Sequence, residues 1–119
     1  MVFVYNFSMA WIKISKTAYA HNINTLAKIA SLKRLCVVLK DDAYGHGLVQ
    51  IARLASELGV QKAVVRNLSE AMAIKEYFSL ILALDPSDAN DELPENIALA
   101  ANSMQDLQSH AHQALHLKV

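Results

Sequence analysis

This sequence of 119 residues contains one cysteine and two prolines, and it has no excess of positive or negative charge. The single cysteine, Cys36, excludes an internal disulfide, and its place in an apolar run predicts a buried thiol in a reducing compartment. Both prolines lie within 85–96, the one segment predicted to be rich in loops. Because 11 basic residues balance 11 acidic ones, the zero net charge gives no reason to expect nucleic acid or an anionic membrane as a partner.

Long apolar runs are also missing. No stretch approaches the roughly 18 residues that a membrane-spanning helix needs. The segment 1–8 is apolar but short, lacks a basic start and is interrupted by Asn6, which argues against a signal peptide. We therefore expect a cytoplasmic protein, and we interpret residues 1–9 as an N-terminal extension because the regular pattern begins just after Met9.

The sequence does contain many apolar residues, 54% against 18% charged, which indicates one ordinary globular domain. Apolar runs of strand length predict strands at 11–14, 35–39, 63–65, 80–84, 97–101 and 115–119. Capped or amphipathic segments between them predict helices after Ser15 or Thr17, at 48–58, from Asn67 to near Phe78, and from Ser103. Strands that alternate with helices predict an α/β fold with a parallel sheet.

Four finer expectations concern packing and chain ends. The first helix should bury one face, formed by Ala18, Ile23, Leu26, Ala27 and Ala30. Gly59 should form a left-handed helix end, and the run 35–39 should be a strand covered on both faces. Because the sequence stops inside a predicted strand and would leave an apolar edge exposed, we expect a truncated domain.

Lys40 follows the apolar run 35–39, at the carboxyl end of a predicted strand. In parallel α/β folds this is where catalytic groups gather. A lysine held away from water is more readily a neutral amine, which can act as a nucleophile or a base. The alternative, which is commoner for a lysine in such a position, is a solvent-exposed side chain that marks where the strand ends.

The residues around Lys40 favour the chemical interpretation. The segment 38–47, VLKDDAYGHG, resembles the lysine motif of alanine racemases, which is valine-valine-lysine-alanine, then asparagine or aspartate, then alanine-tyrosine-glycine-histidine-glycine. The matching positions are Lys40, Asp42, Ala43, Tyr44, Gly45, His46 and Gly47. Asp41 stands where the motif has alanine, and we expect it to alter the surroundings of Lys40 without removing its role.

The resemblance to alanine racemases extends in order along the chain from about Ala10, through 14–24, 63–71 and 115–119. It implies a TIM (β/α)8 barrel, of which residues 10–119 would be the incomplete N-terminal part. It also implies a pyridoxal-phosphate-dependent isomerase that interconverts L- and D-alanine for peptidoglycan. The remainder of the barrel and a β-rich domain would lie beyond Val119.

The same resemblance assigns roles to three residues. Lys40 would be the Schiff-base lysine and one of two bases, Tyr44 would help hold the cofactor phosphate, and Lys118 matches a position that is carbamylated in many members. A plain strand lysine is an equal alternative for Lys118. In the family the second base is a tyrosine from the partner subunit of a homodimer. Because that tyrosine is not in this chain, we expect the 119 residues alone to be inactive.

Other functions remain as alternatives. A non-catalytic pyridoxal-phosphate carrier, or an inactive remnant of a racemase gene, would share the ancestry without the activity. A dinucleotide loop at 45–50 lacks its third glycine and its downstream acid. A metal site among His110, His112 and His116 lacks a further ligand with suitable spacing, so we expect no metal.

Overall fold

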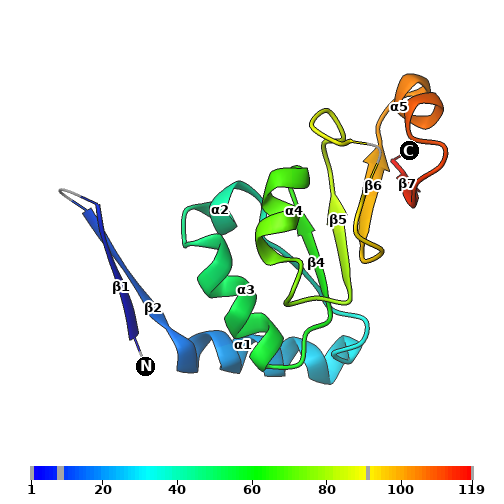
Figure 1. The fold of residues 1–119 in the computed structure, drawn as a ribbon. Coiled ribbons are helices and arrows are strands. Elements are labelled where there is room, and N and C mark those ends of the chain that lie inside the picture. The colour runs from blue at the N-terminus through cyan, green and yellow to red at the C-terminus, as the bar shows by residue number, and fades with distance from the viewer. Residues whose placement is uncertain (1, 8–9, 91, 119) are drawn as a thin grey trace.

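The structure is a computed structural model, and it describes residues 2–7, 10–90 and 92–118. Its strands are β1 (Val2–Phe7), β2 (Ala10–Ser15), β3 (Cys36–Val38), β4 (Lys62–Val65), β5 (Leu80–Ala83), β6 (Ile97–Ala101) and β7 (Leu115–Leu117). Its helices are α1 (Lys16–Ala30), α2 (Lys40–Tyr44), α3 (Leu48–Glu57), α4 (Leu68–Ile74) and α5 (Met104–Ser109). The predicted alternation of strands and helices is therefore confirmed (Figure 1).

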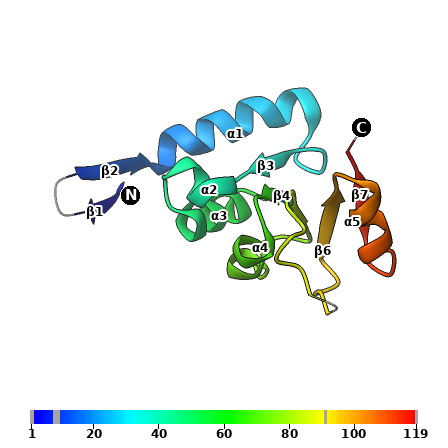
Figure 2. The same cartoon turned by 90° about the horizontal axis from the view of Figure 1, so that it is seen from above.

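The main sheet contains five strands in the order β3-β4-β5-β6-β7, and every neighbouring pair is parallel. Each strand thus pairs with the next strand along the chain, as in a (β/α) barrel. Helices α3 and α4 lie on one side of these strands, whereas α1 lies on the other side of β3 (Figure 2). All carboxyl ends of the five strands consequently lie at one edge of the sheet.

Strand β2 lies outside this sheet and pairs with β1 in an antiparallel hairpin, in a register that joins Val2 to Ser15 and Phe7 to Ala10. The hairpin extends away from the rest of the molecule (Figure 1). The sequence pattern did not predict the strand at 2–7, which forms because an apolar segment can pair locally with the strand that follows it.

The apolar core lies between the sheet and helices α3 and α4. Strands β4 and β5 each bury alternate residues, whereas all five residues of β6 are buried. The fully buried large side chains are Val65, Ile81 and Leu99 from strands and Leu54 and Ile74 from helices. In β4 and β5, this alternation orients one row of side chains toward the helices and leaves the other row facing away from them.

Local signals account for the helix ends. The Ser15 hydroxyl accepts from the Ala18 amide at the start of α1, and the Asn67 and Ser103 side chains accept in the same way for α4 and α5. Gly59 has φ 89°, which confirms the predicted left-handed end after α3. Helix α4 ends at Ile74, earlier than the predicted end near Phe78, because residues 75–77 form a turn.

Three packing predictions are wrong. In α1 only Ile23 is buried, and Leu26 is 50% exposed, because the helix meets the rest of the molecule along a narrow line rather than a broad face. Cys36 is exposed rather than buried, since β3 pairs only with β4 and its outer edge has no neighbour among the described residues. Strand β3 is therefore not covered on both faces. Among the described residues, no helix is long and apolar enough to cross a membrane.

Candidate active site

Polar residues follow all five strands at the carboxyl edge of the sheet. In strand order they are Lys40, Arg66, Asp85, Asn102 and Lys118. The parallel pairing continues up to this edge, because the Leu39 amide donates to the Val64 carbonyl at 2.7 Å and the Lys118 amide donates to the Ala101 carbonyl at 3.1 Å. Since catalytic groups of parallel α/β folds gather at this edge, it is the candidate active site.

Lys40 begins a left-handed helical turn, α2. Four consecutive non-glycine residues, 41–44, have φ between 52° and 56°. Each such residue costs roughly 1–2 kcal/mol, because its Cβ approaches the following carbonyl oxygen. Asp41 and Asp42 tolerate this region better than most residues do. A conformation this costly persists only where the surrounding structure holds it.

Apolar and backbone contacts hold part of the turn. Leu39 and Ala43 are 3% and 4% exposed and belong to the core. The Ala43 amide donates to the Leu39 carbonyl at 2.9 Å, and the Gly45 amide donates to the Asp41 carbonyl at 3.1 Å. Gly45 and Gly47 have φ of 83° and 96°, so both glycines allow the sharp turn into α3.

Side-chain carboxylates hold the remainder of the turn. The Asp42 carboxylate accepts from the Leu48 amide at 2.7 Å, which satisfies the first free amide of α3. The Glu70 carboxylate accepts from the Asp42 amide at 2.9 Å through one oxygen and from the Arg66 amide at 2.8 Å through the other. Glu70 therefore joins the turn after β3 to the end of β4.

Asp41, which departs from the family motif, forms an ion pair with Arg66. The guanidinium Nε donates to Asp41 Oδ1, and Nη2 donates to Oδ2 at 2.6 Å. The hydrogen bonds from Arg66, followed by its charge and that of Lys40, lower the pKa of the Asp41 carboxyl, and the same pair raises the pKa of Arg66. Sequence reasoning missed both Arg66 and Glu70. Arg66 could have been noticed as the first polar residue after an apolar strand.

The amine of Lys40 is available for chemistry. Lys40 is half-buried. Among the residues that the structure describes, none forms a hydrogen bond or ion pair with its Nζ. Lys40 therefore lies at the strand end, as predicted, with its amine unengaged.

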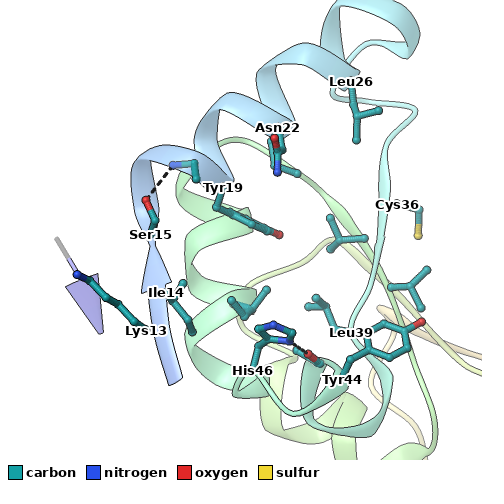
Figure 3. Close-up of a pocket in the computed structure, with 16 residues that line it drawn as sticks. Lys13, Ile14, Ser15, Tyr19, Asn22, Leu26, Cys36, Leu39, Tyr44 and His46 are labelled. Carbon is teal, nitrogen blue, oxygen red and sulfur yellow. Dashed lines mark hydrogen bonds between the residues drawn. The ribbon is translucent and has the colours of Figure 1, made fainter. Parts of the chain in front are cut away.

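A cavity of about 570 Å³ lies beside the turn, between α1 and β3. Tyr44 and His46 from the turn and Tyr19 from α1 point into this region (Figure 3). Tyr44 is 58% exposed, so its hydroxyl is accessible, and His46 Nδ1 lies 3.0 Å from the Ala43 carbonyl oxygen. Lys40 does not line this cavity. The cavity is therefore lined by residues of the turn other than Lys40.

Lys118 lies at the opposite edge of the sheet from the other two residues singled out in the sequence. It follows β7, at the opposite edge of the sheet from β3, and its side chain is exposed. Four strand spacings of about 4.8 Å place it roughly 19 Å from Lys40 along the sheet. The described residues contain no group of three histidine, cysteine, aspartate or glutamate side chains that could hold a metal ion. The structure thus places Lys40 and Tyr44 in the same turn after β3, whereas Lys118 follows β7.

Five successive parallel strands, with helices in most of the connections between them and polar residues at their carboxyl edge, define this chain as part of a (β/α) barrel. The chain belongs to the alanine racemase family, because the family described as "Alanine racemase, N-terminal domain" matches residues 14–119. The fold is accordingly the N-terminal portion of a TIM barrel.

Individual relatives agree with this assignment. The alanine racemase of Nitratiruptor is 43% identical over 84 residues, which cover 70% of this chain and 25% of the relative. The Campylobacter curvus alanine racemase is 40% identical over 100 residues, which cover 83% of this chain and 29% of that relative. That of Campylobacter jejuni is 38% identical over 113 residues, which cover 93% and 34%. The chain thus spans a quarter to a third of the length of these relatives.

Solved structures show the same likeness. The alanine racemase of Oenococcus oeni superposes with a TM-score of 0.67 at 27% identity, over 88% of this chain and 33% of that protein. The alanine racemase of Bartonella henselae, described with covalently bound pyridoxal phosphate, superposes with a TM-score of 0.67 at 26% identity. The superposition covers 81% of this chain and 30% of that protein. The five-stranded sheet therefore corresponds to a part of complete barrels.

Proposed function

We propose that this chain is the cofactor-lysine-bearing part of an alanine racemase, an isomerase that interconverts L- and D-alanine with pyridoxal phosphate. One observation carries the proposal: Lys40 presents an unengaged amine at the carboxyl end of β3, at the start of the turn formed by the family motif. Membership of the family and the cofactor named for the Bartonella henselae relative support it.

The residues present fit pyridoxal phosphate. An aldehyde requires a primary amine, which Lys40 Nζ supplies, and a phosphate requires hydrogen-bond donors, of which the exposed Tyr44 hydroxyl is one. Bound pyridoxal phosphate acts as an electron sink that makes the α-proton of an amino acid acidic. Lys40 and Tyr44 would hold the cofactor, and Lys118 is kept as a proposed carbamylated structural lysine.

The protein groups have distinct tasks in this proposal. Lys40 Nζ would take or deliver the α-proton of alanine on one face of the substrate only. Inversion at the α-carbon requires a second base on the opposite face, which the resemblance assigns to a tyrosine of the partner subunit. Leu39 and Ala43, which are buried, fix the backbone from which the lysine side chain extends. The turn therefore sets the direction of the amine, as geometric control of a proton transfer requires.

The proposal extends to the setting of the whole protein. We infer a cytoplasmic, homodimeric racemase that supplies D-alanine for peptidoglycan and has neither a nucleic acid nor a membrane as partner. The resemblance of residues 38–47 to the racemase motif and the family match support this setting. A pyridoxal-phosphate carrier without activity would share the lysine but would not form D-alanine.

A spectral titration tests the proposal. Pyridoxal phosphate added to the chain should produce the absorbance band of a lysine-bound cofactor, and Lys40→Arg should abolish it while Lys118→Arg leaves it intact. Alanine added to the loaded chain should yield no measurable D-alanine in a chiral assay, because the 119 residues alone are expected to lack the second base. Measurable D-alanine would refute that expectation. An equal band in the Lys40→Arg variant would refute the role of Lys40.

A further inference from the structure

Two contacts tie the turn after β3 to the end of β4. The Asp41 carboxylate receives two N–H groups of the Arg66 guanidinium, and the Asp42 amide donates to Glu70. Glu70 also accepts from the Arg66 amide at 2.8 Å, so both contacts end on one short segment after β4. Beyond their local hydrogen bonds, the first two residues after Lys40 are thus held by the segment that follows the neighbouring strand β4.

The turn needs such support. Four left-handed residues follow Lys40, and of these only Ala43 is buried. Most of the turn therefore gains little from apolar burial. An arginine that meets both oxygens of a carboxylate fixes direction as well as distance, because its donors form a planar fork.

We propose that Asp41 and Arg66 are positioning residues, which lock the left-handed turn against β4 and thereby set the direction in which the Lys40 amine meets pyridoxal phosphate. The pair acts through the backbone and touches neither cofactor nor substrate. This inference rests on the proposed function. It also gives Asp41 a use that the motif, which has alanine at this position, does not supply.

The test compares the chain with Asp41→Asn, Arg66→Gln and the double variant. The control is Glu57→Gln, which breaks the Lys16–Glu57 pair, 2.7 Å long and similarly exposed but remote from the turn. The two readouts are the Kd for pyridoxal phosphate and the circular dichroism of the bound chromophore, which reports its orientation. Thermal melting verifies that every variant is folded.

Each single variant should raise the Kd by about threefold and alter the induced dichroism. The double variant should be no worse than the singles, because both substitutions break one link. Glu57→Gln should match the unaltered chain. Equal affinity and dichroism in Asp41→Asn and Arg66→Gln, or additive effects, would overturn the positioning role while leaving Lys40 as the cofactor lysine. Failure of the unaltered chain to bind through Lys40 would instead overturn the proposed function, and this inference with it.

Discussion

Strand β6 lies inside the five-stranded sheet, whereas the turn that begins at Lys40 follows the edge strand β3, and the two are stabilised in opposite ways. All five residues of β6 are buried, whereas the turn has one buried residue among its five. The turn depends on carboxylates that accept backbone and guanidinium N–H groups. The difference teaches that the stability of this fold and the geometry of its site rest on different interactions, so substitutions should separate them.

The largest effect on stability should come from the core. Ile81→Ala removes a fully buried side chain of β5 and leaves a cavity, which should lower the free energy of unfolding by about 2–5 kcal/mol. Leu117→Ala, on a side chain that is 66% exposed, should change it by less than about 0.5 kcal/mol. Urea unfolding measures both, and equal losses would show that β5 is not part of a packed core.

A smaller loss should follow Asp42→Ala, since the Leu48 amide loses its acceptor at the start of α3. Loss of such a cap costs about 1 kcal/mol. Asp88→Ala is the matched control, because it removes the acceptor of the Leu68 and Ser69 amides at α4, away from Lys40. Both variants should lose stability, but only Asp42→Ala should weaken the binding of pyridoxal phosphate. Weakened binding in both would mean that stability alone governs the site.

Substitutions at two glycines, one next to the turn and one after α3, test the same comparison between the site and the rest of the fold. Gly45→Ala and Gly59→Ala each place a Cβ on a left-handed residue, with φ of 83° and 89°, at a cost of about 1 kcal/mol. Gly59→Ala should cost more, because its Cβ would lie 3.2 Å from Leu32 Cδ1, whereas nothing lies within 4 Å at Gly45. Thermal melts rank the two variants. A greater loss in Gly45→Ala would mean that the turn, and not contact with Leu32, limits stability.

The smallest effect concerns how the stability of the folded chain depends on pH. The pKa of Asp41 is lowered in the folded state, chiefly by the hydrogen bonds from Arg66, relative to its ordinary 3.8. The ion pair therefore contributes fully above pH 3.8 and is lost as the pH falls through the lower folded-state value. The stability difference between the chain and Asp41→Asn should shrink over that range in urea titrations. A difference that is constant with pH would contradict the ion pair.

Features set by neighbouring residues were predictable from the sequence. The caps at Ser15, Asn67 and Ser103 and the left-handed Gly59 follow from local chemistry, and the parallel order follows from alternating strands and helices. The place of Lys40 at a strand end followed from one apolar run.

Features set by distant residues were not predictable in this way. Cys36 was expected to be buried, but the burial of a strand depends on which strands flank it, and β3 lies at an edge. The Asp41–Arg66 pair joins residues 25 positions apart, which no local pattern indicates. The left-handed turn also escaped prediction, because it depends on contacts with Glu70 as much as on its own residues.

Peptide mapping after borohydride reduction of the protein with pyridoxal phosphate tests the central claim most directly. Trypsin does not cleave at a modified lysine, so a label on Lys40 should appear in a peptide that runs from 35 to 53, between Arg34 and Arg53. The account predicts that this peptide carries most of the label at limiting cofactor. A label spread evenly over the exposed lysines, with Lys40 cleaved normally, would contradict it.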